Sequence, residues 1–355
     1  MASPIIIDVA KIFIPSTVAF FVGIAMTPFL THYLYKYKAW KKQSVSLTLD
    51  GKPATISASL HRDEEKKTPR MGGIIIWASA IFTTFFFVFL AKFGGDGFAE
   101  KLDFFSRNQT WLPIFTLVVA SLVGLADDIL VIKNRGGYIA GGLPLTLRIG
   151  VVAILGFIGA WWFYSKLGVT SIDVPFWGVL ELGYFFIPLF VIVMLAIFSG
   201  GVIDGIDGLS GGIMSVIFTA YGGIAFFQSQ IDLAALCFVI AGSILAFLWF
   251  NIPPARFYMS ETGMLGLTTT LTVIAFLTKA VVVLPIIAFP LFLASGSVII
   301  QVLSKKFRNG KKIFLVAPIH HHFEALGWPA YKVTMRFWVI SVICAIIGMV
   351  IALIG

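Results

Sequence analysis

Five short polar stretches interrupt the long apolar runs of this 355-residue chain, and they hold the residues that could carry chemistry. Carboxylates and histidines close to membrane-length apolar runs are costly to bury and usually have a function. Carboxylates, histidines, glycine turns and basic side chains together are typical of a site for metal-bridged phosphoryl chemistry. The five stretches are KKTPRMGG (66–73), GLADD (124–128), GGVIDGIDGLSGG (200–212), NIPPARFYMSETG (251–263) and APIHHHFE (317–324).

Two adjacent acids, Asp127 and Asp128, end the third apolar run. One interpretation is that they form only the hydrated end of a helix. The negative end of a helix dipole disfavours acids, however, so neighbouring carboxylates there need a compensating cation. Mg²⁺ suits this position because it binds one or two carboxylates and keeps water or substrate phosphate as its other ligands.

The acids Asp204 and Asp207 are spaced i, i+3 in a stretch with six glycines. Small residues also pack membrane helices closely, so one interpretation is glycine-mediated packing with two helix caps. The functional interpretation is that the missing side chains let the backbone approach a diphosphate and a nucleotide, while the acids bind metal or base.

A histidine triplet, His320 to His322, contains three of the five histidines in the chain. It follows Pro318 in a basic loop. The chain offers neither a suitable cysteine nor a further histidine to complete a zinc site, so contact with phosphate is the better interpretation. Lys67 and Arg148 supply further cations, although a lysine run beside a membrane is by itself most often an orientation signal.

The composition places these residues in a membrane protein. The chain is 59% hydrophobic and only 12% charged, which leaves too little polar surface for a water-soluble globule. We predict an all-α polytopic membrane protein with about ten transmembrane helices, because ten apolar runs approach the length that crosses a bilayer. The predicted spans are 12–34, 72–92, 111–132, 149–165, 183–199, 209–227, 233–250, 264–278, 280–303 and 333–354.

The basic residues predict the orientation of these spans. Most of the 26 Lys and Arg residues fall in the odd-numbered loops, which should therefore be cytoplasmic. Both termini then face the periplasm, and all five polar stretches lie at a cytoplasmic-face active site in the bacterial inner membrane. Topology and attraction to anionic lipid and substrate account for the net charge of +9, so no nucleic-acid partner is expected.

The domain organisation is expected to be simple, with residues 1–355 forming one integral membrane domain. The alternating segment 44–60 around Asp50 and Gly51 predicts a small β-hairpin in the first cytoplasmic loop. Pro285 and Pro290 predict that the ninth span is broken or tilted. The eighth and ninth spans are so close together that a fused or re-entrant arrangement is the alternative.

With these motifs in this order, the chain resembles the polyprenyl-phosphate N-acetylhexosamine-1-phosphate transferases over nearly its whole length. The segments TPRMGGI, GLADD, DGIDGL and FYMSETG are similar to that family's motifs. The most specific segment is APIHHHFEALGWP, followed by RFWVIS (336–341), which resembles the phospho-N-acetylmuramoyl-pentapeptide transferase branch rather than the GlcNAc-1-phosphate branch.

The resemblance implies that Mg²⁺ is the cofactor and that phospho-MurNAc-pentapeptide moves from its UDP carrier to undecaprenyl phosphate, giving lipid I and UMP. Asp127 is the expected base for the prenyl phosphate, because a carboxylate at the membrane surface can take its last proton. We expect catalytic roles for Asp127, Asp128, Asp207 and His321, substrate contacts from Lys67, Arg148, Asp204, Asn251, His320 and His322, and metal ligation by Glu261 and Asp128.

The sequence departs from the family pattern within the expected site. Glu261 and Ser260 replace Asp and Gly, Gly201 replaces Asn, and Arg70 replaces Thr. These changes are compatible with a divergent branch, with a GlcNAc-1-phosphate transferase or other sugar-nucleotide specificity, or with a catalytically impaired paralogue.

Two rival classes of function remain, and the oligomeric state, for which a homodimer is one alternative, stays open. A transporter would place ionisable residues near the bilayer midplane, whereas the middle of every predicted span is free of carboxylates. A silent binding or scaffold protein would release no UMP.

Overall fold

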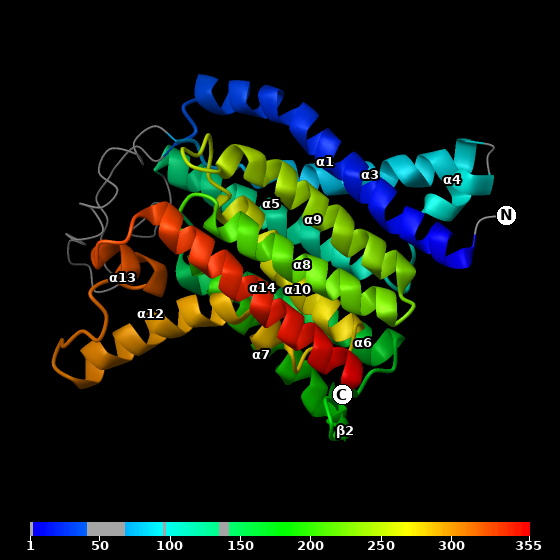
Figure 1. The fold of residues 1–355 in the computed structure, drawn as a ribbon. Coiled ribbons are helices and arrows are strands. Elements are labelled where there is room, and N and C mark those ends of the chain that lie inside the picture. Colours follow the sequence, from blue (N-terminus) through cyan, green and yellow to red (C-terminus); the bar gives the residue numbers. More distant parts are fainter. Residues whose placement is uncertain (1–2, 41–67, 95–96, 135–141) are drawn as a thin grey trace.

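The computed structural model describes residues 3–40, 68–94, 97–134 and 142–355, which form a bundle of long helices (Figure 1). The predicted hairpin at 44–60 and Lys67 lie outside these residues. The helices are α1 (Pro4–Lys36), α3 (Ile74–Phe93), α4 (Gly97–Leu102), α5 (Trp111–Lys133), α6 (Leu145–Lys166), η1 (Gly183–Phe185), α7 (Phe186–Ser199), η2 (Gly200–Ile203), α8 (Leu209–Phe227), α9 (Ile231–Asn251), α10 (Ser260–Leu277), α11 (Leu284–Ile287), α12 (Phe289–Phe307), α13 (Ile319–Ala325) and α14 (Ala330–Ile354).

The structure confirms the polytopic helical fold. Within the described ranges, nine helices are long and apolar enough to cross a membrane, and they coincide with nine of the ten predicted spans. The tenth prediction, 280–303, corresponds to the short α11 and to α12, which are separated at Ala288 in front of Pro290. The predicted break in this span is therefore confirmed, and the turn at 278–283 separates it from α10.

Helix α10 lies in the middle of the bundle. It packs chiefly on α5, while α1 packs on α9 and α8 lies between α9 and α14. Most of α10 is buried although it is the least apolar of the nine helices. Its buried threonines, among them Thr268, Thr269 and Thr272, donate to carbonyls one turn earlier, so their hydroxyl groups are satisfied inside the protein.

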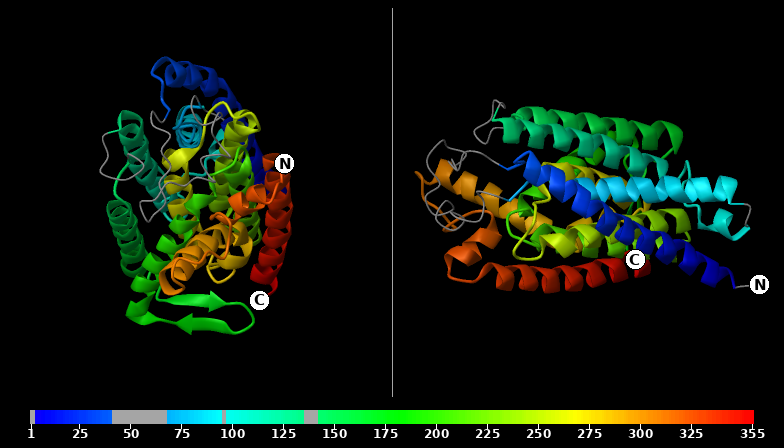
Figure 2. Two further views of the ribbon diagram at one scale, coloured as in Figure 1. Left: turned by 90° about the vertical axis from the view of Figure 1, so that its left-hand side faces the viewer. Right: turned by 90° about the horizontal axis from the view of Figure 1, so that it is seen from above.

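The two ends of the bundle differ. Both termini lie at the end opposite α13, as two views show (Figures 1 and 2). A small antiparallel hairpin of β1 (Ser171–Val174) and β2 (Gly178–Glu181) lies near the C-terminus, with Ser171 opposite Glu181 and Val174 opposite Gly178. This hairpin was not predicted from the sequence. Its turn uses positive φ at Phe176 and Gly178.

Candidate active site

The described parts of all five polar stretches meet at the α13 end of the bundle. Side-chain hydrogen bonds or close contacts join four elements there. These elements are the end of α5, the turn between η2 and α8, the segment from the end of α9 to the start of α10, and α13. Residues more than 100 positions apart in the chain are thus brought together at one end of the bundle.

Asp128 is fully buried and links three segments. Its Oδ1 accepts a hydrogen bond from Arg70 Nε at 2.9 Å. Its Oδ2 accepts from the backbone N–H of Thr262 at 3.0 Å and from the Thr262 hydroxyl at 2.6 Å. Burial lowers the pKa of Arg70, but attraction to Asp128, the hydrogen bond to that carboxylate, and attraction to Glu261 and Asp204 together raise it by more, so the net pKa is raised and the guanidinium stays charged.

Asp127 faces different partners from its neighbour. Its Oδ1 accepts a hydrogen bond of 2.5 Å from the backbone N–H of Leu143, just before α6. The residue is buried, with 3% of its surface exposed. The paired aspartates therefore join α5 to two separate elements, α6 through Asp127 and α10 through Asp128.

Glu261, in the first turn of α10, forms an ion pair with Arg148 of α6. Both side chains keep some exposure, 27% for Glu261 and 14% for Arg148, so they border an open space rather than closed core. A carboxylate in the first turn of a helix is also favoured by the positive end of the helix dipole. The sequence did not predict that Arg148 and Glu261 are partners.

The DGIDG turn is held by hydrogen bonds from several helices. Asp204 accepts from the Ser210 hydroxyl at 2.6 Å and from the Ser260 backbone N–H at 2.8 Å, and Asp207 Oδ2 accepts from the Ala255 N–H at 2.9 Å. Burial raises the pKa of Asp204 above its ordinary value, against the lowering effect of its two hydrogen bonds.

Asn251 completes this turn from the end of α9. Its Oδ1 accepts from the backbone N–H of Gly208 at 2.9 Å, and its Nδ2 donates to the carbonyl of Phe257 at 2.9 Å. Gly208 has a φ of +75°, a conformation that glycine adopts without strain. The contacts of Asn251 are thus with the protein's own backbone, and they shape the turn that presents Asp204 and Asp207.

The histidine motif packs on the same turn. A Cβ atom at Gly205 would lie 2.6 Å from His320 Nε2 and 2.7 Å from His321 Nε2, so both rings reach the turn only because residue 205 is glycine. His321 Nδ1 lies 2.6 Å from Glu324 Oε2. His322 turns elsewhere, with Nδ1 accepting from the backbone N–H of Leu315 at 3.2 Å.

A cavity of about 550 Å³ opens beside these groups. Its charged lining residues are Arg70, Arg148, Asp204 and Glu261. The remaining wall is largely apolar and comes from α6, α7, α10 and α12. Asp127, Asp128, Asp207, Asn251 and the three histidines lie outside its lining. The cavity therefore combines a charged end with a long apolar wall.

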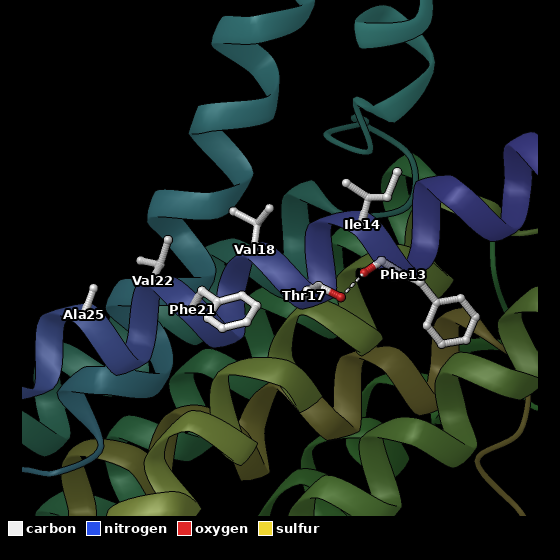
Figure 3. Close-up of a pocket in the computed structure, with 7 residues that line it drawn as sticks. All are labelled: Phe13, Ile14, Thr17, Val18, Phe21, Val22 and Ala25. Carbon is white, nitrogen blue, oxygen red and sulfur yellow. Dashed lines mark hydrogen bonds between the residues drawn. The ribbon is translucent and has the colours of Figure 1, made fainter.

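A second hollow, of about 520 Å³, is of a different kind. It lies along α1, where Ile14, Val18 and Val22 follow one side of the helix (Figure 3). Its polar group, the Thr17 hydroxyl, donates to the carbonyl of Phe13 at 2.8 Å. This lining contains no ionisable side chain and offers no means of handling phosphate.

The charge of the candidate active site favours a cation. Asp127, Asp128, Asp204, Asp207 and Glu261 bring five carboxylates to the described part of the site, whereas Arg70 and Arg148 bring two guanidinium groups. No three His, Cys, Asp or Glu side chains among the described residues converge as a metal cage. Mg²⁺ needs no such cage, since it uses one or two carboxylates and completes its shell with water and phosphate. Asp204 and Glu261, which both line the cavity, fit that requirement.

The sequence assigned no role to four members of the site. Arg70 and Thr262 hold Asp128, Ser260 holds Asp204, and Glu324 holds His321. All four lie inside the quoted motifs, so the motifs could have indicated that they belong to the site. Their hydrogen-bond partners could not be predicted in the same way, because the partners of Arg70, Thr262 and Ser260 lie in other segments of the chain. Glu324 lies one turn from His321 on α13, a helix within a segment that the sequence indicated to be a loop.

Comparison with known proteins gives consistent matches. Residues 110–279 match the model of the glycosyl transferase family 4. The chain is similar to the phospho-N-acetylmuramoyl-pentapeptide-transferases of Listeria welshimeri (35% identical, 80% of this chain and 84% of the relative) and Listeria innocua (36%, the same coverage). The transferase of Rickettsia massiliae is 31% identical over 86% of this chain and 85% of its own length.

Proposed function

The chain belongs to the phospho-N-acetylmuramoyl-pentapeptide-transferase family, and we propose that it transfers phospho-MurNAc-pentapeptide from UDP-MurNAc-pentapeptide to undecaprenyl phosphate. The products are lipid I and UMP, at the first membrane step of peptidoglycan synthesis. The whole chain acts as one integral domain of the bacterial inner membrane, with the candidate active site on the cytoplasmic face and both termini outside.

The observation that carries this proposal is the two-sided cavity. A polyprenyl phosphate has a charged head and a long hydrocarbon chain, and it requires a charged end joined to an apolar wall. Arg70, Arg148, Asp204 and Glu261 supply the charged end, and Leu145, Phe198, Leu265 and Val298 belong to the apolar wall. A water-soluble acceptor would have no use for that wall.

Mg²⁺ is part of the proposal, and when bound it neutralises phosphate oxygens during the transfer. Glu261 and Asp204 are the residues that would hold it, because both line the cavity. Asp128, which the resemblance assigns as a ligand, is fully buried and lies outside the cavity lining. The geometry therefore favours Asp204 over Asp128 as the second ligand.

The chain's own groups account for positioning and proton transfer. Arg148 orients Glu261, and the Asp204 carboxylate is held by Ser210 and Ser260. We assign Asp127 as the base that takes the last proton of the prenyl phosphate, so that the phosphate oxygen can attack the β-phosphorus of the nucleotide sugar, break its bond to the bridging oxygen and expel UMP.

The test of this function is incubation of the purified protein with undecaprenyl phosphate, Mg²⁺ and a panel of UDP-sugars, with release of UMP as the readout. We expect release with UDP-MurNAc-pentapeptide and little with UDP-GlcNAc. Release with UDP-GlcNAc alone would assign the protein to the GlcNAc-1-phosphate branch. No release with any donor would support a catalytically silent relative.

A further inference from the structure

Arg70 is one of the charged residues that line the cavity, although the sequence assigned it no specific role. Its side chain is 26% exposed and lines the cavity together with Arg148. The backbone at this point is tied down on both sides. Arg70 donates its N–H to the Ala39 carbonyl at 2.8 Å, and Pro69 and Gly72 both bond to Tyr258, at 2.9 and 2.8 Å.

The guanidinium of Arg70 is also oriented by the protein. Its Nε donates to Asp128, and the other oxygen of that carboxylate is fixed by two hydrogen bonds from Thr262. Asp128 is fully buried and so cannot swing into solvent. A guanidinium carries five N–H donors in a rigid plane, and the bond to Asp128 uses the Nε donor, on one edge of that plane.

We infer that Arg70 binds the phosphate oxygens of a phosphorylated substrate in this cavity, and that Asp128 acts as its positioning residue. The inference rests on the proposed function. A pre-oriented planar guanidinium at the boundary between buried protein and an open cavity is the arrangement that binds phosphate with directed, charge-assisted hydrogen bonds. Arg148 is less suited to this role because its ion pair with Glu261 uses the terminal Nη1, whereas the ion pair of Arg70 uses Nε.

Two substrates could supply the phosphate, the lipid monophosphate and the diphosphate of the nucleotide sugar. Their shared chemistry is a set of anionic phosphate oxygens, and direct binding measurements separate them. Calorimetric titration of the full-length protein in detergent with Mg²⁺ would use undecaprenyl phosphate in one arm and UDP in the other. Neither arm depends on turnover.

The variants are Arg70→Gln and Arg70→Lys, with Arg308→Gln as the matched control. Arg308 lies at the end of α12, is exposed and is outside the cavity lining, so its replacement removes the same charge elsewhere. Arg70→Gln should weaken binding of one probe tenfold or more, Arg70→Lys should weaken it less, and Arg308→Gln should stay within twofold of the wild type. Weaker binding of undecaprenyl phosphate would show that Arg70 binds the lipid phosphate, and weaker binding of UDP would show that it binds the diphosphate of the nucleotide.

Arg70→Gln leaves a buried carboxylate without its cation and could fail to fold. The double variant Arg70→Gln/Asp128→Asn removes that charge, and its proper reference is Asp128→Asn alone. The inference is overturned if the double variant binds both probes with affinities within twofold of those of Asp128→Asn. It is also overturned if Arg70→Gln folds and its affinities for both probes are within twofold of those of the wild type. Absence of UMP release by the wild type would instead count against the proposed function, because binding is measured separately.

Discussion

Gly124 of α5 lies directly against the backbone carbonyl of Glu261 in α10. A Cβ atom at residue 124 would overlap that carbonyl oxygen and would come within 2.9 Å of Thr262 Cα. The contact places Asp128, one turn further along α5, within hydrogen-bonding distance of Thr262. The glycine of the GLADD motif is therefore a packing requirement for the site.

This contact predicts that Gly124→Ala separates α5 from α10. The atoms in the way belong to the backbone and cannot move aside as a side chain would, so we expect a loss of about 1–3 kcal/mol of stability together with a large loss of turnover. Gly150→Ala is the matched control, because nothing lies within 4 Å of a Cβ atom there. Thermal unfolding in detergent and UMP release would be measured for both. Equal behaviour of the two variants would contradict the prediction.

A second prediction concerns Glu261 and Mg²⁺. Glu261→Gln should raise the Mg²⁺ concentration needed for half-maximal activity, and Glu261→Ala should nearly abolish turnover. Glu261→Asp should do less harm than either, because it keeps the charge and loses only reach. These outcomes follow if the carboxylate binds the ion directly. Superimposable Mg²⁺ titrations of the wild type and Glu261→Ala would remove this residue from the metal site.

The proposed base gives a third prediction. Asp127→Asn should lower turnover by roughly 100-fold or more, the usual contribution of general base catalysis, while UDP affinity stays nearly unchanged. The amide retains an oxygen that can accept the hydrogen bond from the Leu143 N–H, so the start of α6 should stay in place. Turnover and UDP affinity would be compared in one preparation. Near-normal turnover would move the base to Asp128 or Asp207.

A fourth prediction tests the link between His321 and Glu324. Glu324→Gln removes the carboxylate that faces His321 Nδ1, so the ring should lose its fixed orientation toward the DGIDG turn. We expect a several-fold fall in turnover. Glu100→Gln, in the short α4, is the control for loss of one acid. Turnover equal to that of Glu100→Gln would mean that activity does not depend on this contact.

The orientation of the bundle gives a fifth prediction. In a background with Cys237 and Cys344 replaced, a cysteine at Asn309 should react with an inside-directed thiol probe. Cysteines at Ser106 and Ser171 should react only from outside. The reason is the concentration of basic residues in the loops at the α13 end. Labelling of Asn309 from the outer face would reverse the topology and cut the candidate active site off from a cytoplasmic UDP-sugar.

The membrane spans could be predicted from the amino-acid order alone. Hydrocarbon excludes unpaired backbone groups, so each long apolar run must be a helix, and its limits can be read from local composition. Pro290 likewise marked the break before α12. The β1–β2 hairpin could not be predicted from the sequence, because its strands have only four residues each, which is too short for a clear alternation of apolar and polar residues.

In the candidate active site, too, the sequence determined some features and the tertiary structure determined others. The motifs identified Asp127, Asp128, Asp204 and Glu261 as residues with chemical capacity, since acids beside apolar runs are costly. Only the folded bundle decided which cation each acid meets: Arg70 for Asp128 and Arg148 for Glu261. Such pairs join segments 58 and 113 residues apart. They depend on how the helices pack, which is set by steric fit across the whole bundle, whereas each helix is set by its own residues.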